Sequence, residues 1–189
     1  MCSSDLRAYA GEGNHNGIGY YRAADRSDLD PPVRIANVLD GTSNTAAYSE
    51  FVIEQWYGAT GPFTKRQMRA QVYSWAGGTF TEEVRNSCLN QGALNDAGGG
   101  RVMRGVSWSW AFVGVGGAYA HITLPNEKSC HSWDPSGDWY GSNVMAASSE
   151  HPAGVNVGMT DGQVRFMGES VDAEIWWAIG TRNGGETDK

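Results

Sequence analysis

The sequence predicts an α+β domain, and three observations point to this class. Apolar residues recur in short alternating or continuous runs, which are typical of strands rather than of amphipathic helices. Glycine supplies 26 of the 189 residues, about twice its ordinary share, which favours many turns. A clear helical pattern occurs only near the end of the chain. We therefore expect a mainly antiparallel sheet with long Gly-rich loops and a short C-terminal helix.

Five runs of residues have the length and composition of strands. They are Thr45–Ile53, Gln71–Trp75, Val106–Val113, Val155–Met159 and Val164–Met167. Between the last two runs, Asp161 and Gly162 predict a tight two-residue turn. The alternation of apolar and other residues resumes after this turn at Val164 and Phe166. The last two runs should therefore form a β-hairpin.

The final segment predicts a short helix that packs on the sheet. Ser170 is suited to cap a helix that begins at Val171, and Gly180 is suited to end it. Acidic residues in the first turns, which favour a helix N-terminus, are Asp172 and Glu174. The residues that recur at helical spacing are Ile175, Trp176 and Ile179.

Length and charge indicate one domain that does not bind nucleic acid. A chain of 189 residues fits a single domain that buries roughly 70% of its unfolded surface. The formal net charge is -7, with 14 basic against 21 acidic residues, and the basic residues are scattered. This pattern gives no phosphate-binding surface. No window approaches the roughly 18 consecutive apolar residues that a membrane-spanning helix needs.

The first six residues do not look native. Met1 to Leu6 resembles the translated end of a common sequencing adapter. We therefore expect residues 1–6 to be adapter-derived and residues 7–189 to be one globular domain from a longer protein. On this hypothesis the full gene encodes an apolar helix before Arg7.

Four segments resemble, in the same order, a large bacterial family of prepilin-type proteins of unknown function. The most specific is His151, nine residues and then Asp161-Gly162. The others are Asn37-Val38-Leu39-Asp40-Gly41-Thr42-Ser43-Asn44-Thr45 with Glu50, Arg104-Gly105-x-x-Trp108 with Leu124-Pro125-Asn126 and Ser129-Cys130, and Trp177-x-x-x-Gly180-Thr181-Arg182-Asn183-Gly184-Gly185-Glu186.

The resemblance implies a structural function rather than an enzyme. Members of the family carry a basic leader, a cleavage site and a long apolar helix, all of which this chain lacks. The implied protein is a pilin- or pseudopilin-like subunit of a filament linked to type II secretion or type IV pili. Its partners would be other pilin-like subunits, contacted through the missing N-terminal helix. It would be anchored in the inner membrane before assembly and would then lie in the cell envelope or outside the cell.

The residues around Asp40 are expected to hold local structure. The segment 40–45 predicts a turn that leads into the first strand. In such a turn the side chains of Asp40 and Asn44 bind nearby backbone groups. The motif residues that we assign to this structural role, apart from Glu50, are Asp40, Gly41, Thr42 and Asn44.

Glu50 follows on the apolar run after this turn. A carboxylate there could pair with Arg165 or Arg104 across the core. Such a buried pair is better evidence of structural specificity than of stability. We therefore assign Glu50, like residues 40–45, to the fold rather than to a binding site.

His151 and Asp161 raise an acid-base alternative, because a carboxylate orients the histidine in many hydrolase sites. The predicted hairpin puts the two residues at opposite ends of one strand, roughly 16 Å apart by strand rise. We expect His151 to bind backbone in a neighbouring loop and Asp161 and Gly162 to form their own turn. No nucleophile, phosphate-binding or zinc motif accompanies them, so we predict no catalytic residue and no cofactor.

Cysteine parity predicts one disulfide. If Cys2 belongs to the adapter, Cys88 and Cys130 remain as an even pair in a loop-rich chain. In an oxidising compartment their bond would close a loop of about 43 residues, worth roughly 4 kcal/mol in the chain-entropy model. Two buried free thiols are the alternative.

Two weaker candidates concern ligands. Asp134 and Asp138 offer carboxylates in one loop, which is the ligand type that calcium prefers, but they lack the spacing of an EF-hand. Exposed aromatic side chains could stack on sugars, which would make the chain a cell-surface module that binds a solute or polysaccharide. The tryptophans that we nominate for this alternative function are Trp108, Trp110, Trp133 and Trp139.

Overall fold

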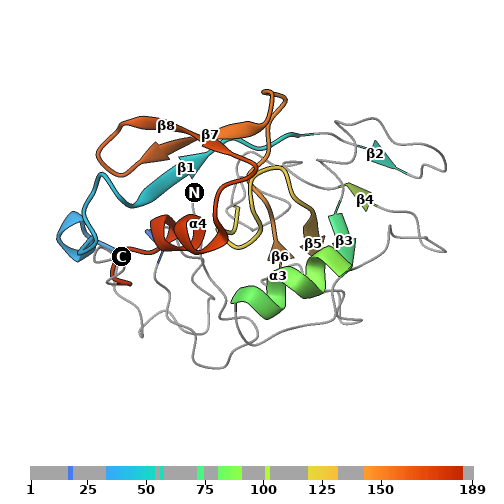
Figure 1. The fold of residues 1–189 in the computed structure, drawn as a ribbon, viewed down its shortest axis with the longest axis horizontal. Helices are drawn as coiled ribbons and strands as arrows, with labels where there is room; N and C mark the ends of the chain where they lie inside the picture. The colour runs from blue at the N-terminus through green and yellow to red at the C-terminus, as the bar shows by residue number, and fades with distance from the viewer. Residues whose placement is uncertain are drawn as a thin grey trace.

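The computed structural model describes residues 17–18, 33–53, 56–57, 72–74, 81–90, 101–102, 119–131 and 143–184. Its elements, in chain order, are η2 (Ile35–Asn37), β1 (Ala46–Ser49), β2 (Trp56–Tyr57), β3 (Val72–Ser74), α3 (Thr81–Asn90), β4 (Arg101–Val102), β5 (Ser129–His131), β6 (Asn143–Val144), β7 (Gly154–Met159), β8 (Val164–Gly168) and α4 (Ala173–Gly180). This confirms the predicted α+β class (Figure 1). The expected strand Val106–Val113 lies outside the described residues, as do residues 1–6.

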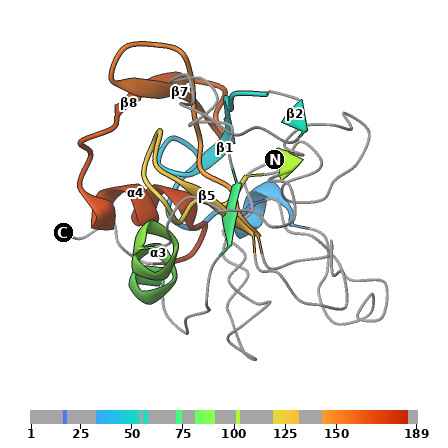
Figure 2. The ribbon, with the colours of Figure 1, turned by 90° about the vertical axis from the view of Figure 1, so that its right-hand side faces the viewer.

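The largest sheet in the described part of the chain has the order β1-β7-β8 and is antiparallel throughout. Ala46 pairs with Met159 and Tyr48 pairs with Gly158, so Ala47 forms a bulge in the edge strand. Along the vertical axis of both ribbon views, α4 lies beneath the β7–β8 hairpin and α3 lies below α4 (Figures 1 and 2).

The predicted hairpin is present, but its turn differs from the expected two-residue form. Met159 N donates to Gln163 O at 2.8 Å and Gly162 N donates to Met159 O at 3.0 Å, which leaves a three-residue loop from Thr160 to Gly162. Gly162 has a φ of 89°. This is the left-handed conformation that the last residue of a three-residue hairpin loop requires. Glycine adopts it without strain.

The main core lies between β7 and α4. Val155, Val157 and Met159 of β7 are buried on one face of the sheet, and Trp176 of α4 is fully buried against them. The other buried members of this cluster are Ala46, Tyr119, Leu124, Met145 and Ala147. Because the buried residues of β7 alternate, the register of the hairpin decides which residues of β8 face the core.

Helix α4 begins two residues later than predicted. Its N-cap is Asp172, not Ser170, and Asp172 Oδ1 accepts hydrogen bonds from Glu174 N at 2.8 Å and Ile175 N at 3.3 Å. The helix ends at Gly180, as predicted. Trp176 is buried as expected, whereas Ile175 is 56% exposed. Ile175 is exposed because it does not lie on the face of α4 that contains Ala173 and Trp176, which is the face that packs on the core.

A second unit joins α3 to a sheet of order β3-β5-β6. The pairing of β3 with β5 is parallel, which the sequence did not predict, and β5 pairs antiparallel with β6. Val84 and Cys88 of α3 are buried in a cluster with Ala120, Ile122, Cys130 and Val144. Only these two residues of α3 are buried in that cluster, so the apolar stripe is too short to give a clear helical pattern in the sequence.

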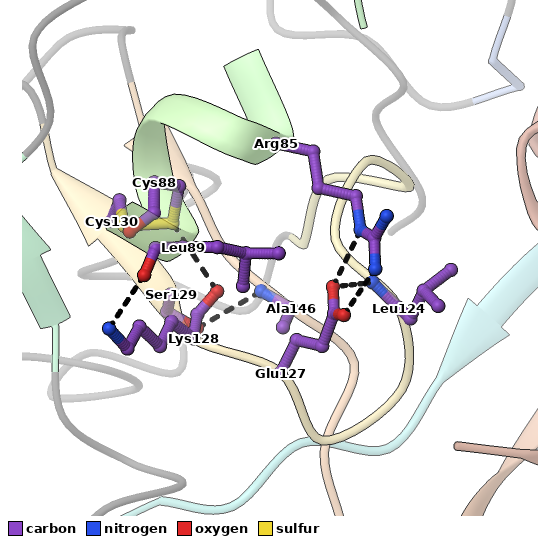
Figure 3. Close-up of a disulfide and its surroundings, with 9 residues drawn as sticks. All are labelled: Arg85, Cys88, Leu89, Leu124, Glu127, Lys128, Ser129, Cys130 and Ala146. Atoms are coloured by element: carbon purple, nitrogen blue, oxygen red, sulfur yellow. Dashed lines mark hydrogen bonds and ion pairs between the residues drawn. A yellow bond between two sulfur atoms is a disulfide. The ribbon is translucent and has the colours of Figure 1, made fainter. Parts of the chain in front are cut away.

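The predicted disulfide joins the two parts of this unit. Cys88 of α3 and Cys130 of β5 are bonded, with 5.7 Å between their Cα atoms (Figure 3). Beside it, Arg85 forms a two-pronged ion pair with Glu127, whose Oε2 also accepts a hydrogen bond from Leu124 N at 2.7 Å. Glu127 therefore connects α3 to the chain that leads into β5.

Candidate functional site: the junction of the sequence motifs

Asp40, at the start of the first motif, is buried and reaches the C-terminal segment. Its Oδ2 accepts hydrogen bonds from Thr181 Oγ1 at 3.2 Å and from Gly184 N at 2.8 Å. The sequence predicts that this carboxylate binds local amides, whereas these two bonds join it to a distant segment. The two donors are 141 and 144 residues away in the sequence, which a local turn rule cannot detect.

The rest of the motif builds the turn that was predicted. Asn44 Nδ2 donates to Asp40 O at 3.1 Å, and Thr45 Oγ1 donates to Gly41 O at 3.1 Å. Gly41 has a φ of 94°, so it supplies the left-handed residue of this turn. The local role that we predicted for Asn44 is therefore confirmed.

The hairpin turn packs against this motif through backbone bonds. Asp161 N donates to Thr42 O at 3.0 Å, and both Thr160 N and Thr160 Oγ1 donate to Thr45 O at 2.8 Å. Asp161 Oδ1 accepts from Gln163 N at 2.9 Å, so its side chain forms its own turn as predicted. The turn and the motif thus satisfy each other's backbone groups.

Arg182, in the C-terminal motif, adds further hydrogen bonds to the first motif. Arg182 O accepts from Leu39 N at 2.6 Å and from Asp40 N at 3.1 Å, and its Nη1 donates to Gly17 O at 2.6 Å. We call residues 39–45, 160–162 and 181–184 together the motif junction. Three of the segments that carry the family resemblance therefore meet in one hydrogen-bonded unit.

Replacing Asp40 with alanine should lower the free energy of unfolding by about 2 kcal/mol, because two donors lose a charged acceptor. Urea titration followed by circular dichroism measures the loss. Asp161→Ala is the matched control: its carboxylate is exposed and binds one amide within its own turn, so the loss should stay below about 1 kcal/mol. Equal losses in the two variants would contradict the role assigned to Asp40.

Glu50 and His151 form a second contact at the other end of β7. Glu50 Oε1 accepts from Asn156 N at 2.6 Å, and Glu50 Oε2 lies 3.4 Å from His151 Nε2. The side chains of His151 and Glu50 are 54% and 33% exposed. The expected pairing of Glu50 with Arg165 is wrong, because Glu50 completes the hydrogen bonding of β7 where β1 ends.

Two further expectations concern this pair. The ring of His151 contacts the Glu50 carboxylate rather than the backbone of a neighbouring loop, so that expectation is wrong. Arg104, the other partner considered for Glu50, lies outside the described residues. His151 and Asp161 occupy opposite ends of β7, as predicted, and the structure does not bring them together as an acid-base pair.

Sequence reasoning missed a fully buried histidine, His121. Its ring stacks on Trp176 with 3.7 Å between ring centroids, and its Nδ1 lies 3.1 Å from the Tyr119 hydroxyl. A Cβ at Gly180 would lie 2.8 Å from His121 Cβ, so glycine permits the close approach of α4. The signal that could have found His121 is its position inside an apolar run from Tyr119 to Leu124.

Burial lowers the pKa of His121 to about 3, although a hydrogen bond with the Trp176 backbone acts in the opposite direction. Between pH 6.5 and 3 the unfolded chain binds a proton at this residue and the folded chain does not. Stability should therefore fall as the pH falls through this range, by up to about 1.4 kcal/mol per unit. Urea titrations from pH 7 to 4 measure the slope.

His121→Gln should reduce this slope, and Ile175→Ala, which changes no titratable group at an exposed position of α4, should leave it unchanged. A slope that is the same in His121→Gln and in the unmodified chain would assign the acid sensitivity to other groups. Both variants also need to be compared at pH 7, where loss of the stacked ring alone lowers stability.

The structure does not describe the residues proposed from the sequence to bind calcium or sugars. Asp134, Asp138, Trp108, Trp110, Trp133 and Trp139 lie outside the described residues. Within the described ranges, no group of three or more His, Cys, Asp or Glu side chains could hold a metal ion. The helices described in the structure are too short or too polar to cross a bilayer.

Comparison with known proteins identifies the family of this chain. No curated protein and no solved structure matches the chain significantly. A model of a bacterial family described as "Protein of unknown function (DUF1559)" matches residues 4–174. This span covers most of the 189 residues and includes the first motif, the hairpin and the start of α4. The chain therefore belongs to the DUF1559 family of proteins of unknown function.

Proposed function

We propose that this protein is a structural subunit, similar to a pilin or pseudopilin, and that it has no catalytic role. In this proposal the domain described here is the globular head of a longer protein. The subunit assembles into a cell-envelope or extracellular filament of the type II secretion or type IV pilus kind. In the proposal, an apolar N-terminal helix of the longer protein makes the contacts between subunits.

The observation that carries the proposal is the way the motif residues are used. Asp40 binds Thr181 and Gly184, and Glu50 binds the amide of Asn156. Each carboxylate therefore satisfies groups of a distant segment. Residues that join distant segments of a fold serve a stable scaffold, which is what a filament subunit requires.

The disulfide supports the compartment that this proposal requires. Bonds such as that between Cys88 and Cys130 form and persist outside the cytoplasm. In the proposal, the longer protein is first held in the inner membrane by its N-terminal helix. The head then lies on the oxidising side of that membrane, where other pilin-like subunits are its partners.

The first experiment is to recover the reading frame upstream of Arg7 and to express the complete gene with a C-terminal tag in the source bacterium. Mass spectrometry of the mature N-terminus should show cleavage before an apolar helix. Shearing of the cells should release the tagged protein in a sedimenting filament fraction. A variant with a blocked cleavage site is the control and should remain in the inner membrane.

A conventional signal peptide, together with a secreted monomer, would contradict the filament proposal. That outcome would favour the alternative of a cell-surface module that binds a solute or polysaccharide. A mature protein that keeps its apolar helix but never leaves the membrane fraction would also contradict filament assembly.

A further inference from the structure

The outer face of the main sheet is unexpectedly apolar. Tyr48 of β1 and Val164 and Phe166 of β8 are 66%, 69% and 55% exposed. They share one face, because Tyr48 pairs with Gly158, Gly158 pairs with Val164, and Phe166 pairs with Asn156. The register that buries Val155 and Val157 turns these side chains away from the core. Exposed apolar side chains gathered on one face typically mark a binding surface.

The two aromatic residues of this face each border a glycine of the central strand. A Cβ at Gly154 would lie 2.6 Å from Phe166 Cζ, so this ring lies over Gly154. A Cβ at Gly158 would lie 3.6 Å from Tyr48 Cβ, which is an ordinary van der Waals distance, so Tyr48 borders Gly158 without requiring glycine there. The two aromatic positions are therefore set by residues four apart on β7, which corresponds to roughly 13 Å of strand.

The strand residues of this face carry no formal charge. The residues of the three strands that point to it are Tyr48, Gly154, Asn156, Gly158, Val164, Phe166 and Gly168. Asn156 lies between the two glycines and offers an amide. Glu50 and His151 border the face beside Asn156, where the carboxylate binds the Asn156 backbone. Together these groups can accept hydrogen bonds from hydroxyl groups and donate hydrogen bonds to them.

These features fit one class of ligand. Neutral polysaccharides present apolar C–H faces, which pack on aromatic rings, and hydroxyl groups, which bind amide and carboxylate groups. An acidic polymer is disfavoured because the chain has a formal net charge of -7. Two rings separated by a polar position suit an extended chain of sugar units better than a single small solute.

We propose that the outer face of β1-β7-β8 binds a neutral polysaccharide chain, which lies across β7 between Tyr48 and Phe166. The site requires only the described sheet, so its failure and the failure of filament assembly are separate results. If both proposals hold, each subunit of a filament would present one such face to extracellular glycans.

The test is affinity gel electrophoresis of the 189-residue chain in gels that contain laminarin, hydroxyethylcellulose, xylan or galactomannan, with polygalacturonate as the acidic polymer. At least one neutral polymer should retard the chain. Tyr48→Ala and Phe166→Leu should each weaken that binding by at least about tenfold, as titration calorimetry with the hexasaccharide of that polymer would show. The leucine keeps an apolar side chain over Gly154 and removes only the ring.

Controls separate binding from folding and from self-association. Tyr48→Phe should bind within about twofold of the unmodified chain, and Ile175→Ala, at an exposed position on α4, should bind unchanged. Failure of all four neutral polymers would overturn the proposal, as would retardation by polygalacturonate alone or equal binding by the ring-deletion variants. Sedimentation that shows dimers lost in Phe166→Leu would assign the face to a second copy and would also overturn it.

Discussion

Trp176→Ala should lower the free energy of unfolding by about 3–5 kcal/mol, the range found for removal of a large buried aromatic side chain. Trp176 is fully buried in the core between β7 and α4. Its ring stacks on His121, and its Nε1 donates to Thr123 O at 2.9 Å. Alanine would remove the stack and the bond and would leave a cavity at the centre of the domain.

Urea titration at pH 7 measures this loss, and near-ultraviolet circular dichroism reports whether the aromatic packing survives. Ile175→Ala is the matched control, because Ile175 occupies the next position on the same helix and is largely exposed. It should change stability by less than about 0.5 kcal/mol. A loss below about 1 kcal/mol for Trp176→Ala would show that α4 does not complete the core.

Replacing both Cys88 and Cys130 with alanine should lower the free energy of unfolding by about 4 kcal/mol, as the chain-entropy model gives for a loop of this length. The bond joins residues 42 positions apart, and both cysteines are fully buried. Without the bond the unfolded chain gains conformational freedom, while the folded chain keeps its packing of α3 on β5. Thermal unfolding and urea titration of the protein from an oxidising host measure the difference.

Reduction of the unmodified chain should reproduce most of this loss, and Cys2→Ser should have no effect on the bond. Thiol titration of the denatured protein should find one free thiol before reduction and three after it. Three free thiols in protein purified from an oxidising compartment would contradict the pairing.

Local patterns predicted the parts of the fold that local physics determines. The hairpin followed from alternation around Asp161-Gly162, and the C-terminal helix followed from its apolar spacing and from Gly180. The disulfide followed from parity once Cys2 was set aside. The misplaced N-cap shows the limit of this reasoning, because serine and aspartate both cap helices well and residue type alone did not identify Asp172 as the cap.

The remaining features depend on contacts between distant segments. No local rule connects Asp40 to Gly184 or Glu50 to His151, since these pairs are set by how β1 packs beside β7. Helix α3 was missed because only Val84 and Cys88 form its buried stripe. The parallel pairing of β3 and β5 was missed because neither short strand carries a pattern that specifies its partner.

The outer face of the sheet shows a different limit of sequence reasoning. Alternation shows that Val164 and Phe166 share a face, but not whether that face is buried. In β7 the buried side chains of Val155, Val157 and Met159 fix the inner face. The register then places Val164 and Phe166 of β8 on the outer face. An apolar pattern that faces solvent is thus visible only once the strands are paired.

The motif junction also sets the order in which this protein can finish folding. Asp40 needs donors that lie more than 140 residues later, and β1 needs β7 as its partner. During synthesis, residues 39–45 and β1 have no partners until most of the chain has left the ribosome. Because closure of such long loops is slow, the junction should form late in folding. Residues 181–184 should therefore complete the junction, and a chain truncated after α4 should lose both of these hydrogen bonds to Asp40.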